Sequence, residues 1–268
     1  MTKFAHFILT VFNVRLSHGG ETSPDSAWLE HRFRLFEEFC YPSVRAQTTS
    51  DFTWLAFFDT STPPEYKDRI AQLAKWKPFV PCFVSEVMSV ESFAGMKKSL
   101  LFPRVSPGTT HLISTNLDND DALHARYVET VQKEFSGQDF EFVNFTNGYV
   151  FDRERERLYL RSHHSNPFAS LLERLENSKT VWCAPHPEFS RIGPVRQVET
   201  EPMWFQVVHG RNVSNSTAEA RRVSLDSIGH GFDAVKIIPR RRESRSSLAL
   251  ENVAIRTRAV LSRITGRQ

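Results

Sequence analysis

The chain has 268 residues, of which 40% are hydrophobic and 24% are charged. This length and composition are typical of one large globular domain, with or without a small appendage. The sequence pattern excludes a transmembrane protein, because no run approaches the ~18 consecutive apolar residues of a membrane span. The three cysteines, Cys40, Cys82 and Cys183, lie far apart in apolar segments and match no metal-binding spacing, which fits small core residues in a reducing compartment.

The net charge of +3 is unevenly distributed along the chain. Residues 239–268 contain eight Arg and two Glu, a local charge of +6, which leaves −3 for residues 1–238. We therefore expect a mildly acidic main domain over residues 1–238 and a basic, helical tail over residues 239–268. The tail is equally consistent with a solvated helix and with contact to anionic lipid. The N-terminus lacks the apolar core of a secretion signal, so we expect a cytoplasmic protein, with peripheral attachment to the inner membrane as an option.

The first half of the chain alternates between apolar, strand-like runs and segments with helical spacing. The predicted strands are residues 4–12, 51–59, 79–84 and 110–117, and the predicted helices are residues 27–46, 63–76, 92–101 and 122–135. This alternation predicts an α/β fold with a mostly parallel central sheet and helices on both faces.

The second half of the chain is less regular. Its pattern predicts a hairpin of residues 140–151 and 158–161, a short helix over residues 167–175, and strands over residues 180–183 and 203–208. No internal repeat is present, so we expect one domain rather than a repeat array.

The acidic run Asp118-Asn119-Asp120-Asp121, directly after the fourth predicted strand, is the strongest chemical signal. Carboxylates packed at the end of an apolar strand repel one another unless a cation or hydrogen bonds compensate. Divalent ions take carboxylate oxygens and substrate phosphates as ligands, and ligands of parallel sheets lie at the carboxyl ends of strands. A helix cap is the alternative, because Asp satisfies free N–H groups at a helix start. The pattern by itself leaves both open.

Five segments of the sequence follow one another in an order and spacing that resemble a known family. They are residues 7–10 with Asn13 and Arg15, then residues 42–47, 51–54, 114–123 and 202–213. Together they resemble the bacterial putative rhamnosyltransferase family, over roughly residues 4–215, with the basic tail outside. The resemblance implies a GT-A-like nucleotide-sugar-binding fold with a DxD motif, and glycosyltransferase activity.

The DxD motif that the resemblance implies would hold a divalent metal ion, Mn²⁺ or Mg²⁺. Asp118 and Asp120 form the pair, with Asp120 as the direct ligand, Asp118 facing the ribose or the ion through water, and Asp121 supporting both. A late histidine often completes the metal shell of GT-A enzymes, and His209, which ends a predicted strand, matches that role. The alternative for His209 is a strand-end histidine bonded to backbone.

The resemblance also implies nucleotide contacts at the carboxyl ends of the first two strands. Thr10, Asn13 and Arg15 end the first strand, where the nucleotide would lie, and Arg15 is either a phosphate ligand or a surface residue. Asp59 ends the second strand, where GT-A enzymes use an acid to read the base, although an Asp in this context also suits a turn. Arg104, before the fourth strand, is a further candidate of the same kind as Arg15.

An inverting transferase needs a group that deprotonates the acceptor hydroxyl. The candidates for this catalytic role include Glu173 and His163, together with Asp152 and His164. A joint metal site at His163 and His164 is not expected, because adjacent residues of a strand point to opposite faces. Trp204 is expected in the core, with stacking on a sugar ring as the alternative.

These observations predict a metal-dependent glycosyltransferase. On the family's name it would move rhamnose, with inversion, from a dTDP- or UDP-linked donor to a glycan or lipid-linked acceptor. A metal-dependent phosphohydrolase or nucleotidyltransferase using the same acids is the alternative, although the Gly19-Gly20 pair comes too late for a nucleotidyltransferase loop. Nucleic acid is not an expected partner, because the main domain is acidic and the tail lacks aromatic residues for base stacking.

Overall fold

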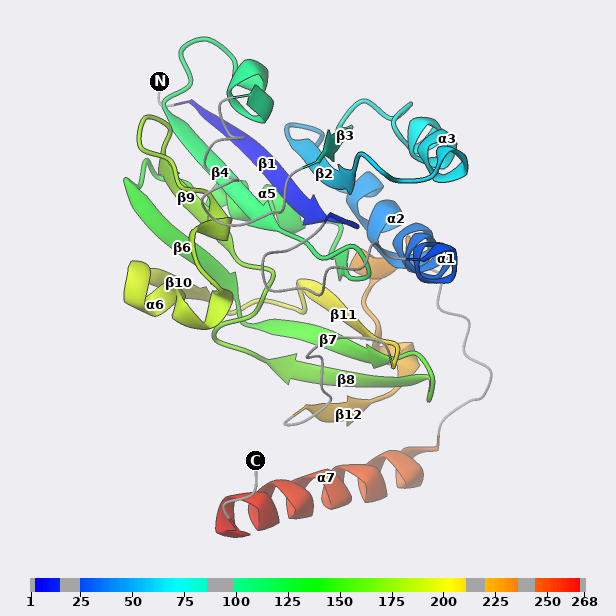
Figure 1. The fold of residues 1–268 in the computed structure, drawn as a ribbon. Helices are drawn as coiled ribbons and strands as arrows, with labels where there is room; N and C mark the ends of the chain where they lie inside the picture. Colours follow the sequence, from blue (N-terminus) through cyan, green and yellow to red (C-terminus); the bar gives the residue numbers. More distant parts are fainter. Residues whose placement is uncertain (1–2, 15–24, 86–98, 211–219, 236–243, 266–268) are drawn as a thin grey trace.

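The computed structural model describes residues 3–14, 25–85, 99–210, 220–235 and 244–265, which form two sheets with helices packed around them (Figure 1). The larger sheet contains β1 (Phe4–Val11), β2 (Thr53–Asp59), β3 (Phe79–Val84), β4 (His111–Asn116), β6 (Phe140–Phe145), β9 (Ser170–Arg174) and β10 (Val195–Val198). The smaller sheet contains β5 (Ala122–Leu123), β7 (Asn147–Asp152), β8 (Arg157–Ser162), β11 (Trp204–Val208) and β12 (Arg221–Val223).

The larger sheet is mostly parallel, as the sequence predicts. Its strand order is β10-β6-β9-β4-β1-β2-β3. β1 pairs in parallel with both β2 and β4, β2 pairs in parallel with β3, and β6 with β10. β9 is the exception, because it runs antiparallel between β4 and β6. The apolar runs of β1, β2, β4 and β9 are buried on both faces, which is typical of a parallel sheet covered on both sides.

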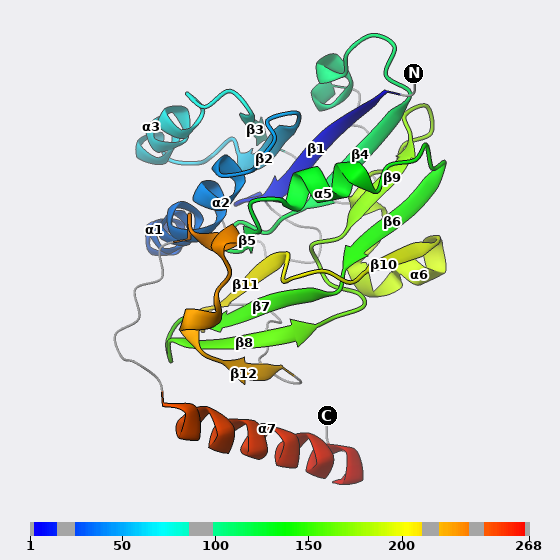
Figure 2. The same cartoon turned by 180° about the vertical axis from the view of Figure 1, so that it is seen from behind.

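Helical segments cover both faces of this sheet. On one face lie α3 (Pro64–Leu73), α5 (Tyr127–Lys133) and a continuous helix made of α1 (Ser26–Leu35), a π-helical turn (Phe36–Cys40) and α2 (Tyr41–Arg45). Figure 2 shows α5 across the back of the sheet. The other face is covered by α6 (Phe189–Ile192) and by 3₁₀ turns at Phe102–Arg104 and Val181–Cys183. Asp25 begins α1 by accepting a 2.7 Å hydrogen bond from the Trp28 N–H, which satisfies a free donor of the first turn.

The strand order reverses between β1 and β4. After β1 the chain builds β2 and β3 on one side, and it then returns to place β4 on the other side of β1. In open α/β sheets, ligands bind outside the carboxyl ends of the strands at such a reversal point. The acidic run 118–121 follows β4 at this point.

Several elements predicted after the fourth strand are wrong. Residues 167–175 contain β9 rather than a helix, because Leu171 and Leu172 are buried on opposite faces of the sheet and the strand shows no alternation. Residues 180–183 form a 3₁₀ turn rather than a strand. The predicted helix 122–135 begins only at Tyr127, after the short strand β5.

Other predicted elements are confirmed with small changes. The continuous helix 26–45 matches the predicted helix 27–46, and β7 and β8 form the hairpin expected around residues 152–157. Residues 140–145 form a separate strand, β6, in the other sheet. Most of the predicted helix 92–101 lies outside the described residues.

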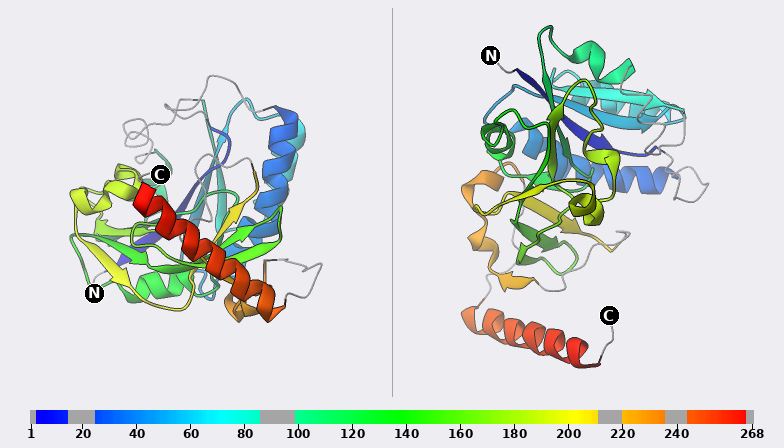
Figure 3. Two further views of the ribbon diagram at one scale, coloured as in Figure 1. Left: turned by 90° about the horizontal axis from the view of Figure 1, so that it is seen from below. Right: turned by 90° about the vertical axis from the view of Figure 1, so that its left-hand side faces the viewer.

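The basic tail contains the long helix α7 (Arg245–Thr265), which lies beyond β12 (Figure 3). The Arg222 side chain of β12 donates to Glu251 at 3.0 Å and to the carbonyl of Leu158 at 2.9 Å. Asn252 adds a 3.0 Å hydrogen bond to the Arg222 carbonyl. These contacts attach one side of α7 to the smaller sheet. Of the helices that the structure describes, none has the length and apolar character needed to cross a membrane.

Candidate active site

The acidic run is fixed to the ends of β1 and β4 by hydrogen bonds. The Leu117 N–H donates to the Leu9 carbonyl at 3.0 Å, which extends the β1–β4 pairing to the start of the run. The Asn119 side chain then donates to the carbonyls of Val11 and Phe12 at 3.1 and 2.9 Å. The run leads into β5 rather than into a helix, so the helix-cap interpretation of the acidic residues is wrong.

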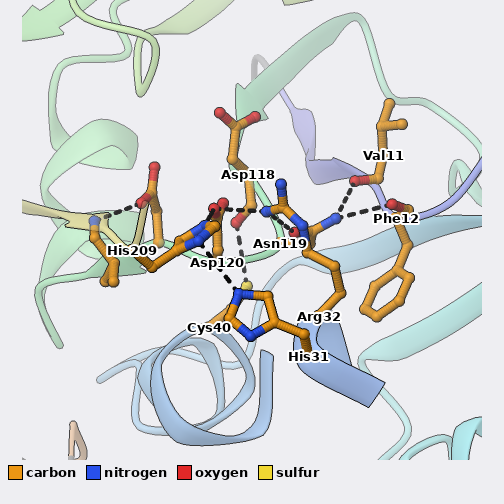
Figure 4. Close-up of polar contacts among 11 residues, drawn as sticks. Val11, Phe12, His31, Arg32, Cys40, Asp118, Asn119, Asp120 and His209 are labelled. Atoms are coloured by element: carbon orange, nitrogen blue, oxygen red, sulfur yellow. Dashed lines mark hydrogen bonds and ion pairs between the residues drawn. The ribbon is translucent and has the colours of Figure 1, made fainter. Parts of the chain in front are cut away.

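Asp120 is the centre of a buried polar cluster (Figure 4). Its Oδ2 accepts a 2.6 Å hydrogen bond from Nη1 of Arg32, on α1, and lies 2.8 Å from Nε2 of His209. The same Arg32 nitrogen donates to Oδ1 of Asn119 at 3.2 Å. The Asp118 side chain points away from this cluster and remains accessible to solvent.

The smaller sheet brings His209 to the acidic run. β11 pairs with β5, so that Trp204 lies opposite Leu123 and Phe205 opposite Ala122. The Val207 N–H donates to Oδ1 of Asp121 at 2.8 Å, and His209 follows at the end of β11. His209 therefore meets a side chain of the predicted DxD pair rather than backbone alone, as the metal-ligand role requires.

The three carboxylates differ in their electrostatic environments. Burial and the charges of Asp120 and Asp118 raise the pKa of Asp121 well above its usual value. The pKa of Asp118 is raised to about 6, because protein atoms crowd the surroundings of its carboxylate and because Asp120 carries a like charge. Burial acts in the same direction on Asp120, but the hydrogen bond with His209 and the charge of Arg32 prevail and lower its pKa. Asp120 is therefore the group held ionised.

The donor chemistry of this cluster fits Mn²⁺ or Mg²⁺, since carboxylate and imidazole are ligands of such ions. Asp121 supports this fit, because its Oδ2 is buried and has no hydrogen-bond partner among the described residues. Ion binding would require two changes. Arg32 and His209 both engage Oδ2 of Asp120 and would have to make room there, and the Asp118 side chain would have to turn toward the cluster. Within the described ranges, no three His, Cys, Asp or Glu side chains are already arranged around a common point that would hold an ion.

The predicted nucleotide-binding residues at the ends of β1 and β2 are engaged with one another. The hydroxyl of Thr10 is fully buried and accepts a 2.9 Å hydrogen bond from the Trp54 indole, so Thr10 is a core residue and not a nucleotide ligand. The side-chain Oδ1 of Asn13 accepts from the Asp59 N–H at 3.2 Å. Asp59 Oδ1 accepts from the Ser61 N–H at 2.7 Å, which is the turn geometry that the sequence left open. Arg15 lies outside the described residues.

Two predicted site residues lie at the opposite edge of the larger sheet. Glu173 pairs with Leu112 of β4, about 20 Å along the strand from Asp118 at ~3.3 Å per residue. Its carboxylate accepts hydrogen bonds from the N–H groups of Lys179 and Thr180 at 2.7 and 2.8 Å, so Glu173 holds a turn and is not the general base. Arg104 lines a hollow beside the amino ends of β1 and β2, away from any phosphate at the acidic run.

His163 lies at the same edge as the acidic run, because its N–H donates to the carbonyl of Thr146, which follows β6, and β6 is the second strand from β4 in the sheet. Burial lowers its pKa to about 4, so the ring is neutral at neutral pH. Its Nδ1 accepts a 3.1 Å hydrogen bond from the Ser165 N–H, which leaves the proton on Nε2. Neither nitrogen is then a free acceptor, so His163 is poorly suited to the predicted role of base. Asp152 accepts from Arg155 at 2.9 Å in the charged turn, a structural role.

His186 meets the requirements of a base that His163 does not. Its Nδ1 lies 2.6 Å from the Ser165 carbonyl, so Nδ1 carries the proton and Nε2 is an acceptor. Burial lowers the pKa of His186, which keeps the ring neutral. This loop is tied to the acidic run through Asn116, which accepts from the Trp182 indole at 2.6 Å and donates to the Pro167 carbonyl at 2.8 Å.

The sequence pattern did not indicate the roles of Arg32, His31 and His186. Arg32 and His31 lie on a predicted helix, where their periodicity is that of a helix surface. Only the fold places Arg32 beside Asp120 and His31 Nε2 3.3 Å from Nδ1 of His209. Trp204 is a core residue, as expected, because it is 1% exposed and stacks on Phe168.

The fold and the site define an α/β protein with an acidic turn at the reversal point of a mostly parallel sheet. The chain belongs to the family described as "Putative rhamnosyl transferase", whose model matches residues 22–221. This membership favours the transferase over the phosphohydrolase and nucleotidyltransferase alternatives. No curated protein shows a significant match to the sequence.

Several solved structures are similar to this chain at low sequence identity. TarS residues 1–349 of S. aureus, in complex with UDP, has 12% identity and a TM-score of 0.43, and the match covers 77% of this chain and 61% of that chain. The chain thus spans less than two thirds of the length of that TarS structure. A putative nucleotide-diphospho-sugar transferase of Desulfovibrio desulfuricans G20 has 11% identity and a TM-score of 0.40, with 95% and 97% of the two chains covered.

Proposed function

We propose that the protein transfers a sugar from a nucleoside-diphosphate sugar, with a divalent cation held by Asp118, Asp120 and His209. The observation that carries this proposal is the contact of Asp120 with His209 at the carboxyl edge of the sheet. This contact lies next to the ends of β1 and β4, where the strand order reverses. When bound, the cation would neutralise the charge of the departing diphosphate. The protein's own part is to hold the Asp120 carboxylate ionised beside His209.

The proposed donor is a dTDP- or UDP-linked sugar, with rhamnose as the sugar on the family's description. Asp59 and Asn13 lie at the carboxyl ends of β2 and β1, where the nucleoside would bind. We assign the general base of an inverting transfer to His186, because its Nε2 is an acceptor and the Ser165 carbonyl orients the ring.

Binding of the nucleotide tests this proposal directly. Calorimetry with UDP and with dTDP, each with and without Mn²⁺, would compare the wild type with Asp120→Ala. Asp68→Ala, an exposed position on α3, is the matched control. We expect tight binding only with Mn²⁺, loss of that binding in Asp120→Ala, and no loss in the control. If the nucleotide affinity is the same with and without Mn²⁺, and the same in wild type and Asp120→Ala, the assignment of the site is refuted.

For the acceptor, we propose a glycan or a lipid-linked glycan, reached from a membrane surface on which α7 rests. Leu250 and Val253 of α7 are 72% and 61% exposed. They lie on the side of the helix opposite Glu251 and Asn252, which attach α7 to β12. An outward apolar face on a tail with a local charge of +6 is typical of a helix that lies on anionic lipid.

Co-sedimentation with lipid vesicles tests this contact. We expect binding to vesicles containing phosphatidylglycerol, weaker binding at high salt, and little binding to pure phosphatidylcholine. The double substitution Leu250→Asp, Val253→Asp should abolish binding to the anionic vesicles while leaving Mn²⁺-dependent nucleotide binding intact. If neither the wild type nor the double variant is recovered with the anionic vesicles, α7 is only a solvated helix.

A further inference from the structure

We propose that Arg32 and the divalent cation are alternative partners of Asp120, so that the cation and the nucleoside diphosphate bind cooperatively. Arg32 would leave Asp120 when the cation arrives and would pair with the diphosphate. This inference rests on the proposed function, and it adds a residue and a binding order to it.

The contacts of Asp120 show why the two cations compete. Arg32 Nη1 lies 2.6 Å from Oδ2 of Asp120, and the two side chains are only 12% and 7% exposed. The same oxygen lies 2.8 Å from Nε2 of His209. A cation bound by Asp120 and His209 would therefore stand beside a buried guanidinium, and two positive charges in one buried site repel each other.

Arg32 also has hydrogen-bonding capacity that the described protein groups do not use. Its hydrogen bonds to Asp120 and Asn119 both come from Nη1. Its Nε is buried and has no partner among the described residues. A guanidinium presents its donors as a planar fork that matches phosphate oxygens, so a diphosphate at this edge would satisfy the donors that remain.

The position of Arg32 on α1 allows this exchange without movement of the backbone. Leu29 and Phe33, on either side of it, are buried in the core and fix the helix. The guanidinium itself packs over the Trp28 ring, 5.2 Å from its centroid, at the outer end of the site. Only the side chain therefore has to change partner.

This exchange has a thermodynamic consequence. In the absence of nucleotide, the cation must break a buried ion pair and leave Arg32 unpaired, so it should bind weakly. In the presence of nucleotide, Arg32 gains the diphosphate, and the cation gains Asp120. Each ligand must then strengthen binding of the other by the same factor.

A binding cycle measures this factor. Electron paramagnetic resonance would give the Mn²⁺ dissociation constant with and without saturating UDP or dTDP, for wild type, Arg32→Gln and the control Arg34→Gln. Arg34 lies on the same helix and is exposed, so its substitution makes the same change of charge outside the site. We expect Arg32→Gln to bind Mn²⁺ alone at least tenfold more tightly than wild type, with a coupling factor at least tenfold smaller. Arg34→Gln should match the wild type.

A second variant, Arg32→Lys, tests the inference even if Arg32→Gln does not fold. Arg32→Lys keeps the positive charge beside Asp120 but lacks the planar fork. It should bind Mn²⁺ alone about as weakly as wild type, and bind nucleotide with Mn²⁺ more weakly than wild type.

The outcomes separate this inference from the proposed function. Suppose that the wild type binds nucleotide with Mn²⁺ and that Arg32→Gln has an unchanged coupling factor. This result would overturn the role of Arg32 and leave the proposed function standing. Wild type that binds neither nucleotide, with or without Mn²⁺, would overturn both.

Discussion

The imidazole Nε2 of His209 lies 2.8 Å from Oδ2 of Asp120, although 89 positions separate the two residues in the chain. The pairing of β11 with β5 produces this meeting, because β5 follows the acidic run directly and His209 directly follows β11. The smaller sheet therefore completes a site that the larger sheet begins.

Substitution of His209 should weaken the site without unfolding the protein. We expect His209→Ala to reduce the affinity for Mn²⁺ in the presence of UDP or dTDP at least tenfold, because one proposed ligand is lost. The measurement is a calorimetric titration. His230→Ala, at a fully exposed histidine, serves as the control. Equal Mn²⁺ affinity in His209→Ala and wild type would remove His209 from the site.

Substitution of His186 should affect catalysis and not donor binding. We expect His186→Asn to slow the release of nucleoside diphosphate in the presence of acceptor by a factor on the order of 10²–10⁴, the usual contribution of a general base. Nucleotide affinity should change little. His164→Asn, at an exposed histidine next to Ser165, whose carbonyl contacts His186, should retain the wild-type rate. A rate equally insensitive to both substitutions would assign the base elsewhere.

Asn119 should support both stability and binding. Asn119→Ala removes the donors to the Val11 and Phe12 carbonyls and the acceptor for Arg32. We expect the free energy of unfolding to fall by about 1–3 kcal/mol, since buried carbonyls lose their partners. Mn²⁺-dependent nucleotide binding should weaken as well, because the acidic run loses its tie to β1. Chemical denaturation and calorimetry measure the two effects, with the exposed Asn177→Ala as the control.

Gly148 should not tolerate a side chain. A Cβ at this position would lie 2.0 Å from the ring of Trp204, which is 1% exposed and stacked on Phe168. We expect Gly148→Ala to lower the free energy of unfolding by about 1–3 kcal/mol through overpacking. Gly229→Ala, where a Cβ meets nothing within 4 Å, should change it by less than about 0.5 kcal/mol. Similar denaturation midpoints for the two variants would contradict the packing described for Trp204.

The stability of the protein should fall in mild acid, in part through His6. Burial lowers the pKa of His6 to about 3, and its Nε2 lies 2.9 Å from the Thr115 hydroxyl. The unfolded chain, with a pKa of 6.5 for this group, therefore binds a proton between pH 6.5 and 3 that the folded protein does not. The stabilisation is complete above pH 6.5 and is lost as the pH falls, at about 1.4 kcal/mol per pH unit.

The variant His6→Gln isolates this contribution. Urea denaturation between pH 6 and pH 4 should show a slope of unfolding free energy against pH that is smaller than that of wild type by about 1.4 kcal/mol per unit. An unchanged slope would mean that His6 takes up its proton in the folded protein.

The sequence by itself determined the first half of the fold and the location of the acidic run. Four buried strands and the helices between the first three of them follow from local periodicity, because a parallel sheet covered on both faces needs continuous apolar runs and amphipathic helices. The same local rules failed at β9, which is buried on both faces and has too few residues to distinguish a strand from a helix.

The tertiary structure alone decided which side chains reach the acidic run. Glu173 and Arg104 share their residue types with true site groups, but strand direction carries them to the opposite edge of the sheet. Arg32 and His186 gave no local signal, because a helix-surface arginine and a loop histidine resemble many others until the fold supplies their partners. Pairing between distant segments depends on strand order and register, and no window of sequence contains that information.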